Sequence, residues 1–156
     1  MEDKLFLEDL HVGQRFFSAS QTVDTDEIKR FAGEFDPQPF HLEEDAAARS
    51  PFAGLVASGW HTAALTMRLL VKGGAPIAGG IIGVGVEIDW PAPTRPGDEL
   101  QVVSEVTAVT PSRTKPNRGI VVLRSETRNQ RGEIVQVLTG KLVVPRKPQA
   151  SAILTE

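Results

Sequence analysis

Cysteine is absent from this chain of 156 residues. Its absence excludes a disulfide framework, a thiolate nucleophile and any zinc or iron–sulfur site built on cysteine, and it fits a reducing compartment. Long apolar runs are absent too, since no stretch approaches the roughly 18 apolar residues of a membrane-spanning helix. The first ten residues lack the basic and then apolar segments of a secretory signal. We therefore expect a cytoplasmic protein that does not enter a membrane.

Charge of one sign is not in large excess. Lys and Arg number 17 against 20 Asp and Glu, for a net charge of −3, which argues against broad binding to nucleic acids or anionic membranes. The hydrophobic fraction of 40% and the charged fraction of 24% are ordinary for a globular protein. The length suits a single domain, which we place at residues 1–145, followed by a frayed tail at 146–156.

Several motifs are also missing. There is no Gly-x-Gly-x-x-Gly, no P-loop and no Gly-x-Ser-x-Gly, and the glycine-rich residues 79–83 lead into a strand rather than a helix. Nucleotide-dependent redox chemistry and phosphoryl transfer are therefore not expected. The three histidines, His11, His41 and His61, form no His-x-x-x-His pair, so we expect neither a metal site nor a cofactor.

The apolar pattern changes character midway along the chain. An amphipathic helix is predicted for residues 24–35, and residues 59–72 form a helix that is apolar nearly all round, which is typical of a buried helix. A strand precedes them at 14–23, and a short helix lies between them at 43–48. From residue 84 the pattern alternates with a period of two. Strands are predicted at 84–90, 100–110, 119–129 and 133–144.

These elements predict an α+β fold in which an antiparallel sheet wraps around one long buried helix. A sheet of about five strands covers only part of such a helix. A second copy of the chain would cover more of it, so we expect a homodimer.

Asp36 and His41 form the first candidate for chemistry. They are five residues apart on a loop that Pro37 and Pro39 stiffen, and two prolines at this spacing predict an extended or turning segment. A carboxylate and an imidazole are suited to acid–base catalysis, provided that the turn brings them together. The alternative is a surface loop in which Asp36 only ends the preceding helix.

The start of the apolar helix is the second candidate. Ser58 is a good N-cap, and Gly59 leaves the free N–H groups of the first turn accessible to a developing oxyanion. The alternative is a capped helix that merely begins with glycine. His61 in the same turn either lines a pocket or is a structural histidine, whereas His11 is expected in a surface turn.

The basic loop near residue 115 is the third candidate. Arg113, Lys115 and Arg118 bring three positive charges and no negative one, which suits the phosphates of a large anionic substrate. A solvated surface loop is the alternative.

The spacing Asp36-x-x-Pro39-x-His41, preceded by Phe31-Ala32 and followed by Ala57-Ser58-Gly59, resembles the MaoC-like dehydratase family, which includes the (R)-specific enoyl-CoA hydratases. The resemblance covers roughly residues 6–144. It is supported by Asp9-Leu10-x-Val12-Gly13 and by Pro93-x-x-Pro96-Gly97-Asp98.

The resemblance implies a single hotdog domain, a homodimer, and reversible hydration of a trans-2-enoyl thioester carried by coenzyme A or acyl carrier protein. It implies Asp36, His41 and Gly59 as catalytic residues. Substrate-binding residues would be Ser58, Trp60, Arg113, Lys115 and Arg118. Gln38 and Ser58 depart from the asparagine and histidine of many members, so the acyl chain is not transferred. The alternatives are a hotdog-fold thioesterase and a non-catalytic acyl-thioester-binding protein.

Overall fold

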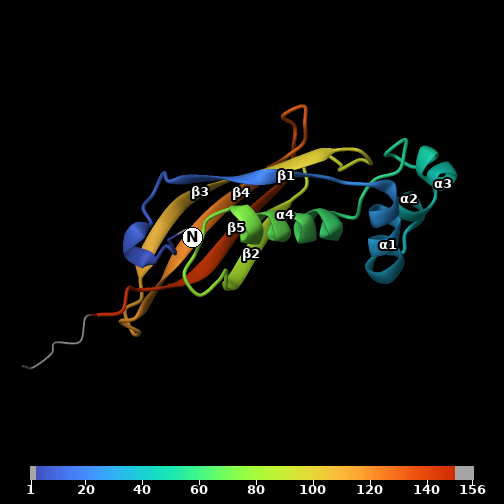
Figure 1. Cartoon of the computed structure of the whole chain (residues 1–156). Coiled ribbons are helices and arrows are strands. Elements are labelled where there is room, and N and C mark those ends of the chain that lie inside the picture. The colour runs from blue at the N-terminus through green and yellow to red at the C-terminus, as the bar shows by residue number, and fades with distance from the viewer. Residues whose placement is uncertain (1–2, 150–156) are drawn as a thin grey trace, which may run out of the picture.

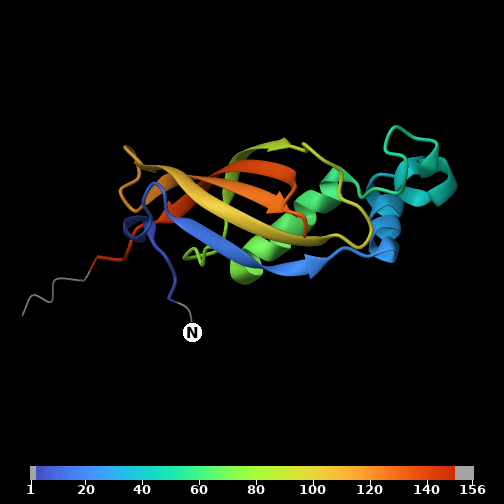
Figure 2. The ribbon, with the colours of Figure 1, turned by 90° about the horizontal axis from the view of Figure 1, so that it is seen from above.

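A five-stranded antiparallel sheet curls around one long helix, α4, and three shorter helices project beyond one end of the sheet (Figures 1 and 2). The computed structural model describes residues 3–149. The strand order is β1-β3-β4-β5-β2, with every neighbouring pair antiparallel. This is the α+β hotdog arrangement, so the predicted fold class is confirmed. The elements are η1 (Leu7–Asp9), β1 (Arg15–Thr22), α1 (Thr25–Phe35), α2 (Pro39–Leu42), α3 (Glu44–Ala48), α4 (Gly59–Gly73), β2 (Gly83–Asp89), β3 (Glu99–Pro111), β4 (Arg118–Arg128) and β5 (Ile134–Pro145).

Helix α4 is buried on one face only within the single chain. Its N-cap is Ser58, as predicted, and the hydroxyl accepts the N–H of Trp60 at 3.2 Å. As expected from the sequence, the single chain covers only part of this apolar helix. The face packed against the sheet and α1 carries the buried residues His61, Thr62, Leu65, Thr66, Leu69 and Leu70. The opposite face leaves Trp60, Met67 and Val71 exposed.

The segment around His41 also differs from the prediction. Residues 36–41 were expected to be a non-helical loop, but α2 forms a single helical turn that begins at Pro39. Proline is tolerated at the first helical position because its missing N–H would have no partner there and its fixed φ already suits a helix. The two prolines therefore do not exclude a helical turn that starts at the second one.

Two hydrophobic clusters fill the space between helix and sheet. One lies beneath α4 and contains Ile28, Leu65, Leu69, Leu100 and Val135. The other lies at the far end and packs Leu7 and Leu10 against β3, β4 and β5. Burial of these side chains is the main favourable contribution to folding, at roughly 25 cal/mol per Å² of apolar surface.

An exposed edge strand and an anchored C-terminal segment lie at the margins of the fold. Strand β2 is an edge strand, and Val84 and Val86 are exposed on it. The segment after Pro145 is not simply frayed, since the Lys147 ammonium lies 2.8 Å from the carboxylate of Asp9 and its N–H donates to Glu8 at 3.0 Å. The rest of the predicted tail, residues 150–156, lies outside the described residues. No helix in the described part of the chain is long and apolar enough to cross a membrane.

Candidate active site

His41 is anchored inside the protein by one of its ring nitrogens. Its side chain is buried, and Nδ1 lies 2.7 Å from the carbonyl oxygen of Val56. A carbonyl oxygen only accepts hydrogen bonds, so Nδ1 carries a proton and donates it. This leaves Nε2 to face Asp36, whose Oδ2 is 3.1 Å away. The imidazole is therefore fixed in orientation, with Nε2 directed at the Asp36 carboxylate.

Asp36 ends helix α1 and points back toward α2. Its N–H donates to Ala32, and its carbonyl accepts the N–H of Gln38 at 2.7 Å, so the chain turns sharply between the two helices. That turn brings Asp36 and His41 together, as the catalytic prediction required. The Gln38 amide also donates to Asp36 Oδ1 at 2.6 Å, which leaves Oδ2 for the histidine.

The Asp36 carboxyl is held in its charged form. Partial burial raises its pKa, but the Ser58 hydroxyl, the Gln38 amide and positive charge at His41 together outweigh burial, so the pKa of Asp36 lies below its usual value. An ionised carboxylate next to an imidazole can hold a water molecule and stabilise the imidazolium that forms when the ring accepts a proton.

Gly59 supplies a backbone donor to the same site. It is the first residue of α4, where an N–H has no acceptor within the helix. No hydrogen bond from this N–H forms among residues 3–149. The N-terminus of a helix also carries partial positive charge. The Gly59 N–H is therefore available to an oxygen atom that gains negative charge.

A pocket of about 460 Å³ joins these groups. Asp36, His41 and Gly59 line it together, and most of the remaining wall is apolar or aromatic. The other lining residues are Gln38, Phe40, Phe52, Val56, Ala57, Trp60, Thr62, Trp90, Pro91, Ala92, Pro93 and Thr94. The pocket thus combines a proton-transfer pair, a free N–H and apolar walls, which suits an acyl compound with a carbonyl group.

The two predicted binding residues beside Gly59 differ in position. Trp60 lines the pocket, with its ring edge-on to Trp90 at 5.5 Å between centroids. Ser58 is fully buried and is not among the lining residues. The structure gives Ser58 the roles of helix cap and neighbour of Asp36, so its predicted contact with substrate stays a prediction that this geometry does not favour.

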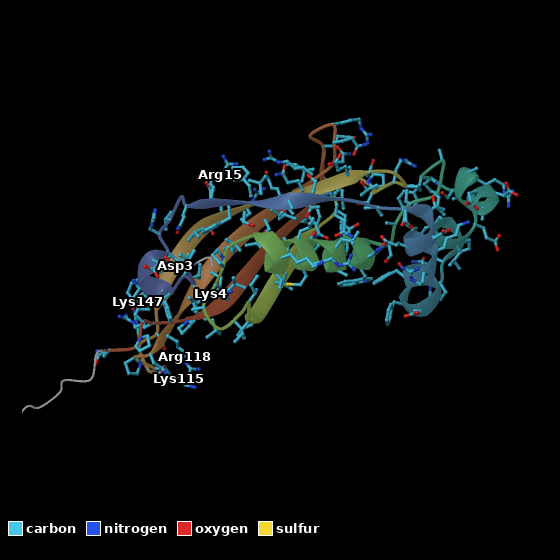
Figure 3. All side chains as sticks on the ribbon, viewed as in Figure 1. Asp3, Lys4, Arg15, Lys115, Arg118 and Lys147 are labelled. Carbon is cyan, nitrogen blue, oxygen red and sulfur yellow. The ribbon has the colours of Figure 1, made fainter. Side chains whose placement is uncertain are left out.

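The basic loop is far from this pocket within one chain. Figure 3 places Lys115 and Arg118 at the opposite end of the sheet from α1 and α2. There the start of β4 packs against η1, because a Cβ on Gly119 would lie 2.7 Å from the Leu7 side chain. Arg113 belongs to the same loop. Contact with a substrate in the pocket would need a second copy, so binding by these three residues stays a prediction.

His61 lies outside the pocket. It is buried and stacks on Phe31, with ring centroids 4.8 Å apart, and it lines a separate cavity of about 190 Å³ between α1 and α4. Burial, assisted by the positive charges of Arg68 and Arg30, lowers the pKa of His61, so its ring is neutral near pH 7. No three or more His, Cys, Asp or Glu side chains in residues 3–149 are placed to hold a metal ion.

Sequence reasoning missed the far wall of the pocket. Trp90 follows β2 and lies against the first residue of α4, so that a Cβ added to Gly59 would be 2.6 Å from its Cε2 atom. Its indole N–H donates to the buried Gln136 at 3.0 Å. The alternation of residues 84–90 predicted only a strand. No local signal links Trp90 to Gly59 or to Gln136, which are 31 and 46 positions away in the sequence.

The chain is similar in sequence and fold to known proteins. The model of the MaoC like domain family matches residues 10–128. The chain belongs to the MaoC-like dehydratase family. Its fold resembles the crystal structure of the MaoC-like dehydratase from Rhodospirillum rubrum, with a TM-score of 0.91 and 63% identity over 93% of this chain and 99% of that one.

Two further relatives are similar in sequence. The uncharacterized protein YdeM of Bacillus subtilis is 37% identical over 141 residues, which is 88% of this chain and 96% of the relative. The 3-hydroxybutyryl-CoA dehydratase of Methylorubrum extorquens is 34% identical over 117 residues, which is 71% of this chain and 69% of the relative. The predicted family is therefore confirmed, and the dehydratase relative supports a hydratase or dehydratase kind of activity.

Proposed function

We propose that the protein is a hydratase that adds water reversibly to a trans-2-enoyl thioester, giving the 3-hydroxyacyl thioester. The observation that carries this proposal is the pairing of Asp36 Oδ2 and His41 Nε2 at 3.1 Å in one pocket with the free N–H of Gly59. Hydration needs both parts, a pair that moves a proton and a donor that stabilises an enolate oxygen.

A water molecule held by Asp36 and His41 loses a proton to the pair as its oxygen bonds to C3 of the enoyl group. The electrons of the C2–C3 double bond move toward the thioester carbonyl, whose oxygen gains negative charge and accepts the Gly59 N–H. The enolate then collapses, and C2 takes the proton back from the pair. Dehydration is the reverse, and neither direction needs a redox step.

The size of each contribution follows from similar groups in other enzymes. Acid–base assistance typically contributes about 10²–10⁴ in rate. One oxyanion donor contributes about 10²–10³. The charged state of Asp36 supports the first of these roles, because a protonated carboxyl would not stabilise an imidazolium at His41.

Coenzyme A is the favoured carrier of the acyl group, because the 3-hydroxybutyryl-CoA dehydratase relative is named for a coenzyme A thioester. Acyl carrier protein is the other carrier open to this site. We also propose a homodimer, since it would cover the exposed side chains Met67 and Val71 on α4 and the exposed edge strand β2. The cytoplasmic location stays a prediction.

The experiment that tests the proposal follows the loss of the conjugated thioester absorbance with enoyl-CoA substrates. Asp36→Asn and His41→Gln should each lower kcat at least about 10²-fold. The double variant should have a kcat scarcely lower than that of the less active single variant, because the effects of residues that act as a unit are not additive. Binding of a saturated acyl-CoA should change little. The matched control Asp45→Asn changes an exposed carboxyl outside the pocket and should keep wild-type kcat.

Three outcomes would contradict the proposal. Hydration close to the wild-type rate by a folded Asp36→Asn protein would remove the carboxylate from the mechanism. Release of free thiol from saturated acyl-CoA without hydration would indicate a thioesterase. Binding of enoyl-CoA without turnover by the wild-type protein would indicate an acyl-thioester-binding protein.

A further inference from the structure

Trp90 forms a wall of the pocket directly beside the proposed oxyanion donor. A Cβ built on Gly59 would lie 2.6, 2.8 and 2.9 Å from the Cε2, Cζ2 and Cδ2 atoms of its indole. The flat side of the ring system therefore packs on the Cα of Gly59. Any acyl group whose carbonyl oxygen accepts the Gly59 N–H has its first carbon atoms next to this ring.

The indole is held by a buried polar chain behind it. Its Nε1–H donates to Gln136 Oε1 at 3.0 Å, and Gln136 Nε2 donates to Thr66 Oγ1 at 3.0 Å. The Thr66 hydroxyl donates its one proton to the carbonyl of Thr62 at 2.9 Å. The Thr127 hydroxyl, 2.6 Å from the Thr66 hydroxyl, is therefore the donor of that hydrogen bond.

These hydrogen bonds hold the Trp90 indole in place. Gln136 and Thr66 are fully buried in the single chain. If the indole swung away, the amide oxygen of Gln136 would lose the one donor it has among residues 3–149, a hydrogen bond worth about 0.5–1.5 kcal/mol. Trp60 also contacts the ring edge-on, from the side of the pocket.

We propose that Trp90, positioned by Gln136, determines acyl-chain length by blocking long chains beside Gly59, so that the enzyme prefers short-chain acyl thioesters. This inference rests on the proposed function, because it takes the acyl carbonyl to be bound at Gly59. Trp90 is the specificity-determining residue that touches the acyl group. Gln136 is a positioning residue that acts through it.

The test compares kcat/KM for crotonyl-CoA and trans-2-octenoyl-CoA. Trp90→Leu should raise the ratio of octenoyl to crotonyl activity at least about tenfold, since even one methylene in an apolar pocket is worth about that factor. Gln136→Met should raise the ratio in the same direction, and Gln136→Glu, which keeps an acceptor for the indole, should restore part of the wild-type preference. Trp60→Leu removes an indole that has no such anchor and should change the ratio less than Trp90→Leu does.

A binding measurement separates this inference from the proposed function. The chain has two tryptophans, so Trp60→Phe leaves Trp90 as the sole indole fluorophore. Butyryl-CoA should shift its emission and should bind at least about tenfold more tightly than octanoyl-CoA. If the protein binds in this way but hydrates no enoyl-CoA, the chain-length role of Trp90 is supported and the proposed hydratase function is rejected.

Two results would overturn the inference. The first is an active, folded Trp90→Leu protein whose octenoyl to crotonyl ratio stays within about threefold of the wild type, a change smaller than one methylene contributes. The second is an unchanged Trp90 emission in the Trp60→Phe protein when it is saturated with butyryl-CoA. If Trp90→Leu does not fold, the octenoyl to crotonyl ratio is measured instead on Trp90→Phe, which keeps an aromatic ring.

Discussion

Gly59→Ala adds a single methyl group at the point where helix, pocket wall and oxyanion donor meet. The new Cβ would lie 2.6 Å from Trp90 Cε2, so the indole must retreat by about 0.9 Å to reach a normal carbon contact of about 3.5 Å. A retreat of that size stretches or breaks the 3.0 Å hydrogen bond to Gln136. Overpacking typically costs about 1–3 kcal/mol and a lost hydrogen bond about 0.5–1.5 kcal/mol. Alanine's better helix propensity offsets about 1 kcal/mol at most.

We therefore expect Gly59→Ala to lower the free energy of unfolding by about 1–3 kcal/mol and to lower kcat/KM, although the backbone N–H itself remains. Chemical denaturation at fixed protein concentration measures the first effect, and the enoyl-CoA assay measures the second. Gly33→Ala is the matched control. Gly33 is exposed within α1 with nothing within 4 Å of its would-be Cβ, so the same change there should stabilise the protein by up to about 1 kcal/mol.

A double-mutant cycle tests the steric explanation. Trp90→Leu makes room for the methyl group, so adding Gly59→Ala to it should cost less than adding Gly59→Ala to the wild type. The coupling should fall in the range of about 0.5–3 kcal/mol that residues in contact show. If the two changes are additive, or if Gly59→Ala stabilises the protein as Gly33→Ala does, contact with Trp90 does not explain why glycine occupies this position.

Three other predictions concern neighbouring features. Ser58→Ala removes a helix cap and should cost about 0.5–2 kcal/mol in thermal unfolding; it also removes a group that lowers the pKa of Asp36, so the acid limb of the kcat/KM profile should move to higher pH, and an unmoved limb would contradict this. The lowered pKa of His61 means that only the unfolded chain takes up a proton between the folded pKa and about 6.5, so wild-type stability should fall as pH drops through this window. His61→Gln should flatten that fall in urea unfolding, whereas His11→Gln, on the surface, should not. Val71→Lys places a charge on the exposed face of α4 and should shift sedimentation from dimer to monomer; a wild-type protein that is already a folded monomer at micromolar concentration would exclude the proposed dimer.

Most of the elements could be predicted from the chain alone because their signals are local. The amphipathic spacing of α1, the apolar run of α4 and the alternation of the late strands each express a period of a single helix or strand. The predicted helix at 59–72 differs from α4 by one residue at its end. The sequence left the pairing of Asp36 with His41 open, because the two side chains meet only if the segment between them turns, and the turn between α1 and α2 is seen only in the structure.

The errors concern features that depend on the third dimension. An apolar helix surface does not tell which face the sheet will cover, and in the single chain Met67 and Val71 lie on the exposed face of α4. The helical turn at Pro39 was missed because a proline stops a helix that is under way but can begin a new one. Trp90 and Gln136 were missed because their contacts join residues that are far apart in sequence.

The order of strands in the sheet bears on how the chain folds as it is synthesised. Strand β1 is made first, yet its only neighbour is β3, so more than 75 residues must emerge before it can pair. Strand β2 waits for β5, the last strand made. Only β3, β4 and β5 form a run of neighbours consecutive in sequence, which favours them as the first part to form. Strand β2 therefore stays unpaired until its partner residues in β5 are made, and a truncation within β5 would leave β2 without that partner and open to aggregation.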